Sequence, residues 1–102
     1  MGAMMGNSLK SARFLIESRI ADAARGDAGA LYELGVFYST GTGGADYDLI
    51  EAHKWFNLAA VAGHAPAQEA RGEIADDMTA REIATAQAAA RAFLQSTRRL
   101  AA

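Results

Sequence analysis

The sequence predicts an all-α fold built around one stacked helix-turn-helix repeat. Apolar residues recur every three or four positions along five segments, and glycines stand at the segment ends. Small residues fall where two helices must touch, with aromatic residues one turn away. No stretch shows the alternation of apolar and polar residues that a strand requires. Stacked helical repeats usually bind other proteins, so the pattern favours an interaction module over a catalytic pocket.

The first predicted helix covers residues 8–25. Ser8 is its expected N-cap, and Gly26 is expected to end it in a left-handed turn. Residues 1–7 are expected to be a disordered start, because residues 1–4 resemble an expression-vector remnant ahead of a second methionine at position 5.

The second and third predicted helices cover residues 28–40 and 49–62. Asp27 is the expected N-cap of the second helix. Asp48 and Glu51 predict a capping box at the start of the third. Gly35 lies inside the second helix, where glycine costs about 1 kcal/mol relative to alanine. That cost is tolerable where a neighbouring helix must approach closely.

A glycine-rich segment at residues 41–47 joins these two helices. A phosphate-binding loop would follow a strand and would carry a lysine followed by serine or threonine. This segment follows a helix and has no lysine. The sequence therefore predicts a turn, in which Gly41 closes the second helix in a left-handed conformation.

The last two predicted helices cover residues 65–77 and 80–98. Pro66 falls in the first turn of the fourth helix, where a missing N–H is tolerated. Thr79 and Glu82 predict a capping box for the fifth. Arg71 stands where the first copy of the pattern has Leu34, so the second copy is degenerate. The fifth helix is expected to cover the open end of the stack.

Charge is distributed unevenly along the chain, whose net charge is −2. Residues 26–78 carry two basic against nine acidic residues, a net charge of −7, whereas both ends are basic. The acidic middle argues against a nucleic-acid partner. It favours a basic peptide or a head-to-tail contact between copies, although acidic helix starts on a solvated face explain it equally well.

The sequence also indicates the size of the domain and the cellular compartment of the protein. The 102 residues suit one small domain, and the absence of cysteine excludes disulfides and cysteine-ligated metals. Lys10 and Arg13 interrupt the first apolar run, so no signal peptide is predicted. No run is long enough to span a membrane. The expected location is the cytoplasm, unless a leader has been removed.

Residues 26–63 resemble a Sel1-like repeat, a relative of the tetratricopeptide repeat. The resemblance implies a short right-handed α-solenoid of antiparallel helix pairs with about five helices. It implies one domain over residues 8–99, with a full repeat at 26–62 and a partial repeat plus capping helix at 63–99. The second repeat departs from the family in lacking its own loop and second helix, unless the fifth helix plays that part. The matching structural positions are Ala30, Leu34, Gly35, Tyr38, Gly41, Gly43, Asp48, Ala52, Trp55, Ala59, Ala60 and Gly63.

The resemblance implies a bacterial, non-catalytic adaptor or scaffold, in signalling or envelope regulation, that binds a protein or peptide partner. No catalytic residue, cofactor or metal ligand is implied, because the motif residues are structural. An alternative is a self-associating unit that dimerises through an apolar end face. About three repeats are normally needed for a stable stack, and this chain has one complete unit.

Candidate site residues follow from the same pattern. His53 and His64 are too far apart for a metal pair on one helix, and His64 is expected to cap the fourth helix. Trp55 is expected in the core, with Phe56 the more exposed of the two. In helix-pair solenoids the free face of the first helix of each pair lines a concave groove. The expected groove residues are Glu33, Val36, Phe37, Thr40, Ala70, Glu73 and Ile74, unless the first or fifth helix covers them.

Overall fold

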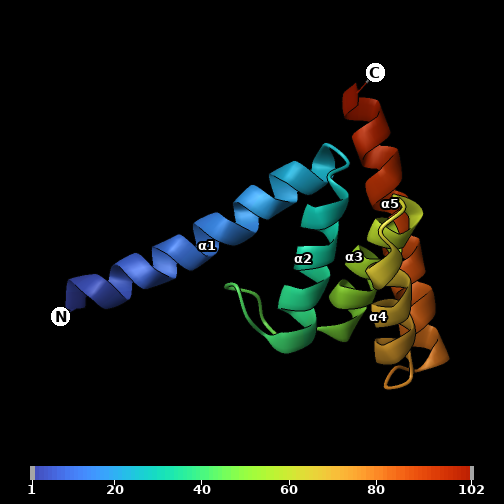
Figure 1. Cartoon of the computed structure of the whole chain (residues 1–102), viewed down its shortest axis with the longest axis horizontal. Coiled ribbons are helices and arrows are strands. Elements are labelled where there is room, and N and C mark those ends of the chain that lie inside the picture. The colour runs from blue at the N-terminus through green and yellow to red at the C-terminus, as the bar shows by residue number, and fades with distance from the viewer. Residues whose placement is uncertain (1, 102) are drawn as a thin grey trace.

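The computed structural model describes the backbone of residues 2–101 and the side chains of residues 11–98. In this part the chain forms five α-helices and no strand, which confirms the all-α prediction (Figure 1). The helices are α1 (Gly2–Ala24), α2 (Ala28–Thr40), α3 (Leu49–Val61), α4 (Ala65–Ala75) and α5 (Ala80–Ala101).

The helix bounds agree closely with the sequence, except at three ends. α1 begins at Gly2, so Ser8 lies inside the helix and is not its N-cap. No proline precedes Ser8 to stop the helix from extending backwards. α4 ends at Ala75, because the amides of Asp77 and Met78 bond to Ile74 and Ala75 in a tighter turn. α5 continues to Ala101.

The caps predicted at Asp27 and at Thr79–Glu82 form as expected. Asp27 accepts a hydrogen bond from the Ala30 amide at 3.0 Å. Thr79 and Glu82 form the reciprocal box, with distances of 3.1 Å to the Glu82 amide and 2.8 Å from the Thr79 amide.

The box predicted at the start of α3 forms on one side. Asp48 accepts from the Glu51 amide at 3.1 Å, but the Asp48 amide bonds to the Tyr38 carbonyl at 2.9 Å. Because that amide is already satisfied, the Glu51 carboxylate is free to bind elsewhere. It accepts a hydrogen bond from Trp55 Nε1 at 3.1 Å and pairs with Lys54 Nζ at 3.0 Å.

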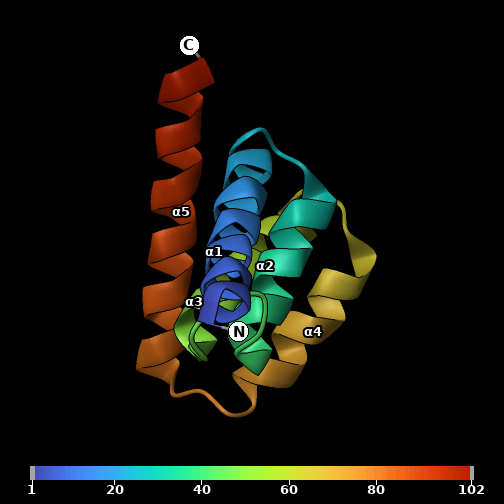
Figure 2. The ribbon, with the colours of Figure 1, turned by 90° about the vertical axis from the view of Figure 1, so that its left-hand side faces the viewer.

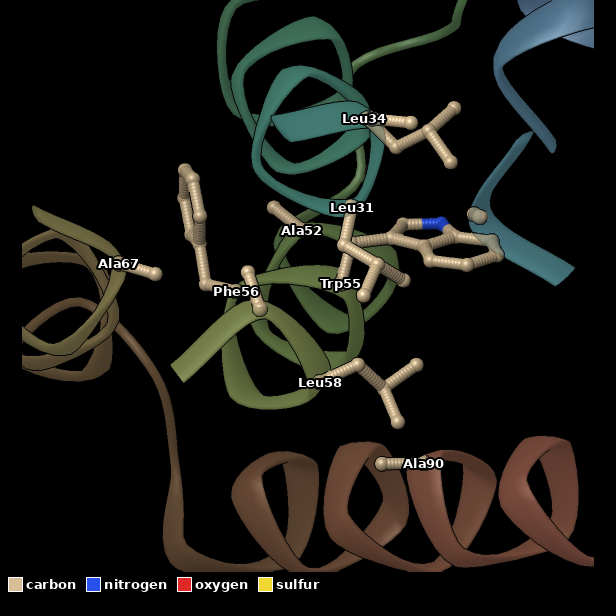
Figure 3. Packing of buried hydrophobic residues seen from close by; sticks show 11 residues of the cluster. Leu31, Leu34, Ala52, Trp55, Phe56, Leu58, Ala67 and Ala90 are labelled. Atoms are coloured by element: carbon tan, nitrogen blue, oxygen red, sulfur yellow. The ribbon is translucent and has the colours of Figure 1, made fainter. Parts of the chain in front are cut away.

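α3 is the central helix of the fold. It contacts α2, α4 and α5, whereas α1 packs on α2 (Figure 2). Ala52, Ala59 and Leu34 are fully buried, and the small side chains of the two alanines let the helix backbones come close. Trp55 points towards the end of α1 and Phe56 points towards α4 (Figure 3). Most of the predicted motif positions therefore belong to the core: Ala30, Leu34, Gly35, Ala52, Trp55 and Ala59 are buried, and Tyr38 and Ala60 pack against them.

α2 and α3 approach closely at Gly35. A Cβ atom at this position would overlap the ring of Phe56. Phe56 is 2% exposed, so the expectation of a partly exposed ring was wrong. The ring lies against Gly35 on one side and 5.5 Å from the Tyr32 ring, and α4 covers it.

The glycine-rich segment is a turn, as predicted. Gly41 closes α2 with φ 68°, and its amide donates to the Phe37 carbonyl. Gly43 and Gly44 also have positive φ. A Cβ on Gly44 would lie 2.8 Å from the Ala12 carbonyl oxygen, so this glycine allows the loop to approach α1. Gly63 (φ 94°) reverses the chain after α3.

α1 diverges from the other helices, and the end of α5 extends past the bundle (Figure 1). The radius of gyration is 14.2 Å, somewhat above the value of about 13 Å typical of a compact chain of this length. One side of α1 therefore packs on α2, and the opposite side is more open.

Substitution of Gly35 tests the close approach of α2 and α3. We expect Gly35→Ala to lower the free energy of unfolding by about 1–3 kcal/mol, because the new methyl group must displace the Phe56 ring. Gly72 is the matched control: it is an exposed helical glycine in α4 with no atom near its Cβ position. Gly72→Ala should raise the free energy by about 0.5–1 kcal/mol. Urea unfolding followed by circular dichroism measures both, and equal effects of the two substitutions would contradict the packing described.

Candidate functional site

A largely apolar hollow lies where the ends of α1 and α3 meet the second half of α5. We call it the helix-end hollow, and its volume is about 340 Å³. It is lined by Ala23, Ala24, Arg25, Gly26, Leu31, Leu58, Val61, Ala62, Phe93, Leu94, Thr97 and Arg98.

The hollow follows from the unequal lengths of the helices. α5 has 22 residues and α3 has 13, so α5 continues past the end of α3. α1 ends nearby, because Gly26 turns the chain with φ 86°. Side chains in the second half of α5 therefore face the helix ends, and Val61 is left 69% exposed at the rim.

The wall of the helix-end hollow is anchored by an aromatic pair. The Phe93 ring meets the Trp55 ring edge-on, with centroids 5.0 Å apart and planes at 76°. Such edge-to-face pairs contribute about 0.5–1.5 kcal/mol beyond the area they bury. Trp55 is 3% exposed, in agreement with its predicted core position. Lys54 Nζ lies 4.3 Å from the centroid of the Trp55 ring, so a cation covers part of it.

A second hollow lies between α1 and the glycine-rich segment. We call it the loop hollow; it is lined by Ala12, Arg13, Ile16, Tyr38 and residues 44–48. Its lining is acidic, because it has two carboxylates, Asp46 and Asp48, and one basic side chain, Arg13. Burial and the neighbouring carboxylates of Glu51, Asp48 and Asp46 raise the pKa of the Tyr38 hydroxyl. The raised pKa is consistent with a negative potential at this end of the molecule.

The structure separates the predicted groove residues of α2. Glu33 is exposed and pairs with Arg19 of α1 at 3.3 Å. Val36 and Phe37 are half-buried against the core. Gly43 packs so closely on the Phe37 ring that its Cβ position would lie 2.6 Å from that ring. The glycine-rich segment thus packs on Phe37. Thr40 is exposed, and its hydroxyl bonds back to the Val36 carbonyl at 2.7 Å.

The predicted groove residues of α4 lie on another surface. Ala70 and Glu73 line a small hollow with Tyr32, Pro66 and Glu69, between α2 and α4. Ile74 packs against the core. The predicted set therefore does not converge on one hollow. Nothing local to Val61 in the sequence marked it as part of a site.

The two histidines lie in different surroundings. His53 is 3% exposed, and its Nδ1 has no hydrogen-bond partner within the described part of the chain. Burial, and then the nearby Arg71, lower the pKa of His53. His64 occupies the N-cap position of α4 as predicted, but its side chain makes no capping hydrogen bond. Its ring instead packs on Tyr32, with centroids 4.6 Å apart.

Arg71 makes a polar contact between α3 and α4. Its Nη1 donates to Asn57 Oδ1 on α3 at 2.5 Å, so the α3–α4 contact is polar at this point. Hydrogen bonds to charged groups contribute about 1.5–3 kcal/mol when partly buried.

The described residues contain no cluster of three or more side chains suited to hold a metal ion. Within the same part of the chain, no helix combines the length and apolar character needed to cross a membrane.

Comparison of the chain with protein-family models, with curated proteins and with solved structures gives no match. The resemblance of residues 26–63 to a Sel1-like repeat therefore stays a prediction from the sequence. The site has to be interpreted from its own geometry and chemistry.

The surroundings of His53 predict a pH dependence of stability. Its pKa is lowered in the folded state from the ordinary value of 6.5, so the unfolded state binds more protons in the window below pH 6.5. The free energy of unfolding should therefore fall as the pH is lowered through this window.

Denaturant unfolding at a series of pH values between about 7 and 5 measures the slope. We expect His53→Gln to remove part of the dependence, because glutamine does not titrate. His64→Gln leaves His53 in place and should retain it. The explanation fails if the His53→Gln variant keeps the full slope.

Proposed function

We propose that this protein is a non-catalytic interaction module that binds a protein or peptide partner through the helix-end hollow. The observation that carries the proposal is the apolar lining of this hollow, open at a rim where Val61 is 69% exposed. An apolar pocket with a polar rim is the usual form of a partner-binding surface. The lining includes no histidine and no carboxylate, whereas acid–base chemistry usually relies on such groups.

The repeat pattern of the sequence supports the same proposal. A helix-pair repeat of the Sel1-like kind is an adaptor scaffold, and α2–α3 form an antiparallel pair with the expected small residues between them. In this proposal α4 and α5 extend the pair into a short right-handed solenoid. Specificity then lies in side chains that the repeat pattern does not fix, such as Val61, Thr97 and Arg98.

Affinity capture with matched variants tests this function. We expect Val61→Asp to lose a partner that the wild-type protein captures from an extract of the native cell, because a carboxylate at the rim must be desolvated when the partner binds. Phe14 is the control: it is 72% exposed on α1 and does not line the hollow. Phe14→Asp should retain the partner. Equal capture by both variants would contradict the proposed site.

Self-association is a second candidate function, and the exposed apolar residues of α1 favour it. Phe14 and Leu15 are 72% and 38% exposed. α1 packs on α2 and diverges from the remaining helices, so its free face is open to a second copy. An isologous contact between two such faces would give a symmetric homodimer.

Sedimentation velocity distinguishes this candidate. If α1 mediates a homodimer, the wild-type protein should sediment as a dimer at about 100 μM and Phe14→Asp as a monomer. A wild-type monomer at that concentration would count against self-association. Val61→Asp serves as the control, since its side chain lies at the other surface.

A further inference from the structure

The helix-end hollow and the loop hollow lie on the same side of α1. Ile16 lines the loop hollow, and Ala23 and Ala24 line the helix-end hollow. Ile20 lies between them in sequence, one helical turn from each, so it belongs to the same stripe of the helix. It is 37% exposed. A strip of apolar side chains therefore runs along α1 from one hollow to the other.

The two ends of this strip carry opposite charges. At the helix-end hollow both charged lining residues are arginines, Arg25 and Arg98. Arg25 pairs with Asp22, whereas Arg98 has no ion pair among the described side chains. At the loop hollow Asp46 and Asp48 outnumber Arg13. Burial raises the pKa of Tyr38 at this hollow, and the carboxylates of Glu51, Asp48 and Asp46 raise it further.

We infer that the two hollows form one surface for an amphipathic helix supplied by a protein partner, oriented with its acidic first turn at Arg98 and its basic last turn at Asp46. The inference rests on the proposed function and adds to it the chemistry and the direction of the partner. An acidic start and a basic end also interact favourably with the helix dipole, so the same charges stabilise the helical conformation of the partner before it binds.

The distance between the hollows sets the length of the partner helix. Arg13 and Ala24 mark the two ends on α1, and eleven helical steps correspond to about 16 Å. A partner helix of about three turns spans this distance, with apolar residues at i, i+3, i+4 and i+7 facing the strip. Such a helix need not be stable alone, because packing of its apolar face supplies the stabilisation.

Two designed peptides test the inference by fluorescence anisotropy. Each has about 14 residues, with leucine at the helical spacing above and alanine elsewhere. The first carries two glutamates in its first turn and two lysines in its last turn, and the second exchanges the glutamates and lysines. We expect the wild-type protein to bind the first about five- to tenfold more tightly.

A charge-reversed protein separates recognition from the helicity of the peptides. Arg98→Glu combined with Asp46→Lys leaves the net charge unchanged, and both side chains are exposed. This double variant should prefer the second peptide. The matched control is Arg91→Glu with Asp77→Lys, two exposed positions that line neither hollow. It should keep the preference of the wild-type protein.

Three results would overturn the inference. The first is that neither peptide binds at millimolar concentration, and the second is that the preference survives in the Arg98→Glu, Asp46→Lys variant. The third is a dimer that Val61→Asp dissociates, since a second copy would then occupy the surface. If cellular capture still depends on Val61 while either of the first two results holds, the partner chemistry is wrong and the proposed function stands. If capture does not depend on Val61 and neither peptide binds, both the inference and the proposed function fail.

Discussion

The close approach of α2 and α3 at Gly35 determines the rest of the fold. Because Gly35 has no side chain, the ring of Phe56 lies directly on the α2 backbone. α3 in turn contacts α4 and α5, so its position relative to α2 fixes where those helices lie. The Trp55–Phe93 contact holds α5 in place against α3. The helix-end hollow thus depends on a glycine that is not part of it.

Features controlled by neighbouring residues could be predicted from the sequence. The bounds of α2, the Asp27 cap and the Thr79–Glu82 box follow from local hydrogen bonding, which a few consecutive residues determine. The close approach at Gly35 could also be predicted, since glycine inside a helix is costly without a packing reason. The exposure of Phe56 could not, because it depends on how α4 covers the ring.

The candidate site escaped prediction because its residues belong to four helices. Leu31, Val61 and Phe93 are far apart in sequence, and they meet because α5 continues past the end of α3. The predicted groove rested instead on the spacing within single helices. Phe37 illustrates the difference: the pattern places it in an open groove, but the glycine-rich segment packs on it. A periodic pattern specifies which face of a helix is apolar and leaves open which element covers that face.

The structure places basic and acidic residues at opposite ends of the strip along α1. The basic C-terminal ends of α1 and α5 come together at Arg25 and Arg98, while carboxylates gather at the other end of the strip along α1. Arg13 and Ala24, which mark the two ends on α1, are about 16 Å apart along the helix axis, and charges in physiological salt are screened beyond about 8 Å. The two ends therefore act separately on a bound segment. Two local contacts would determine the orientation of a bound partner helix, and a single substitution would change either one. The net charge of −2 would contribute little to that orientation.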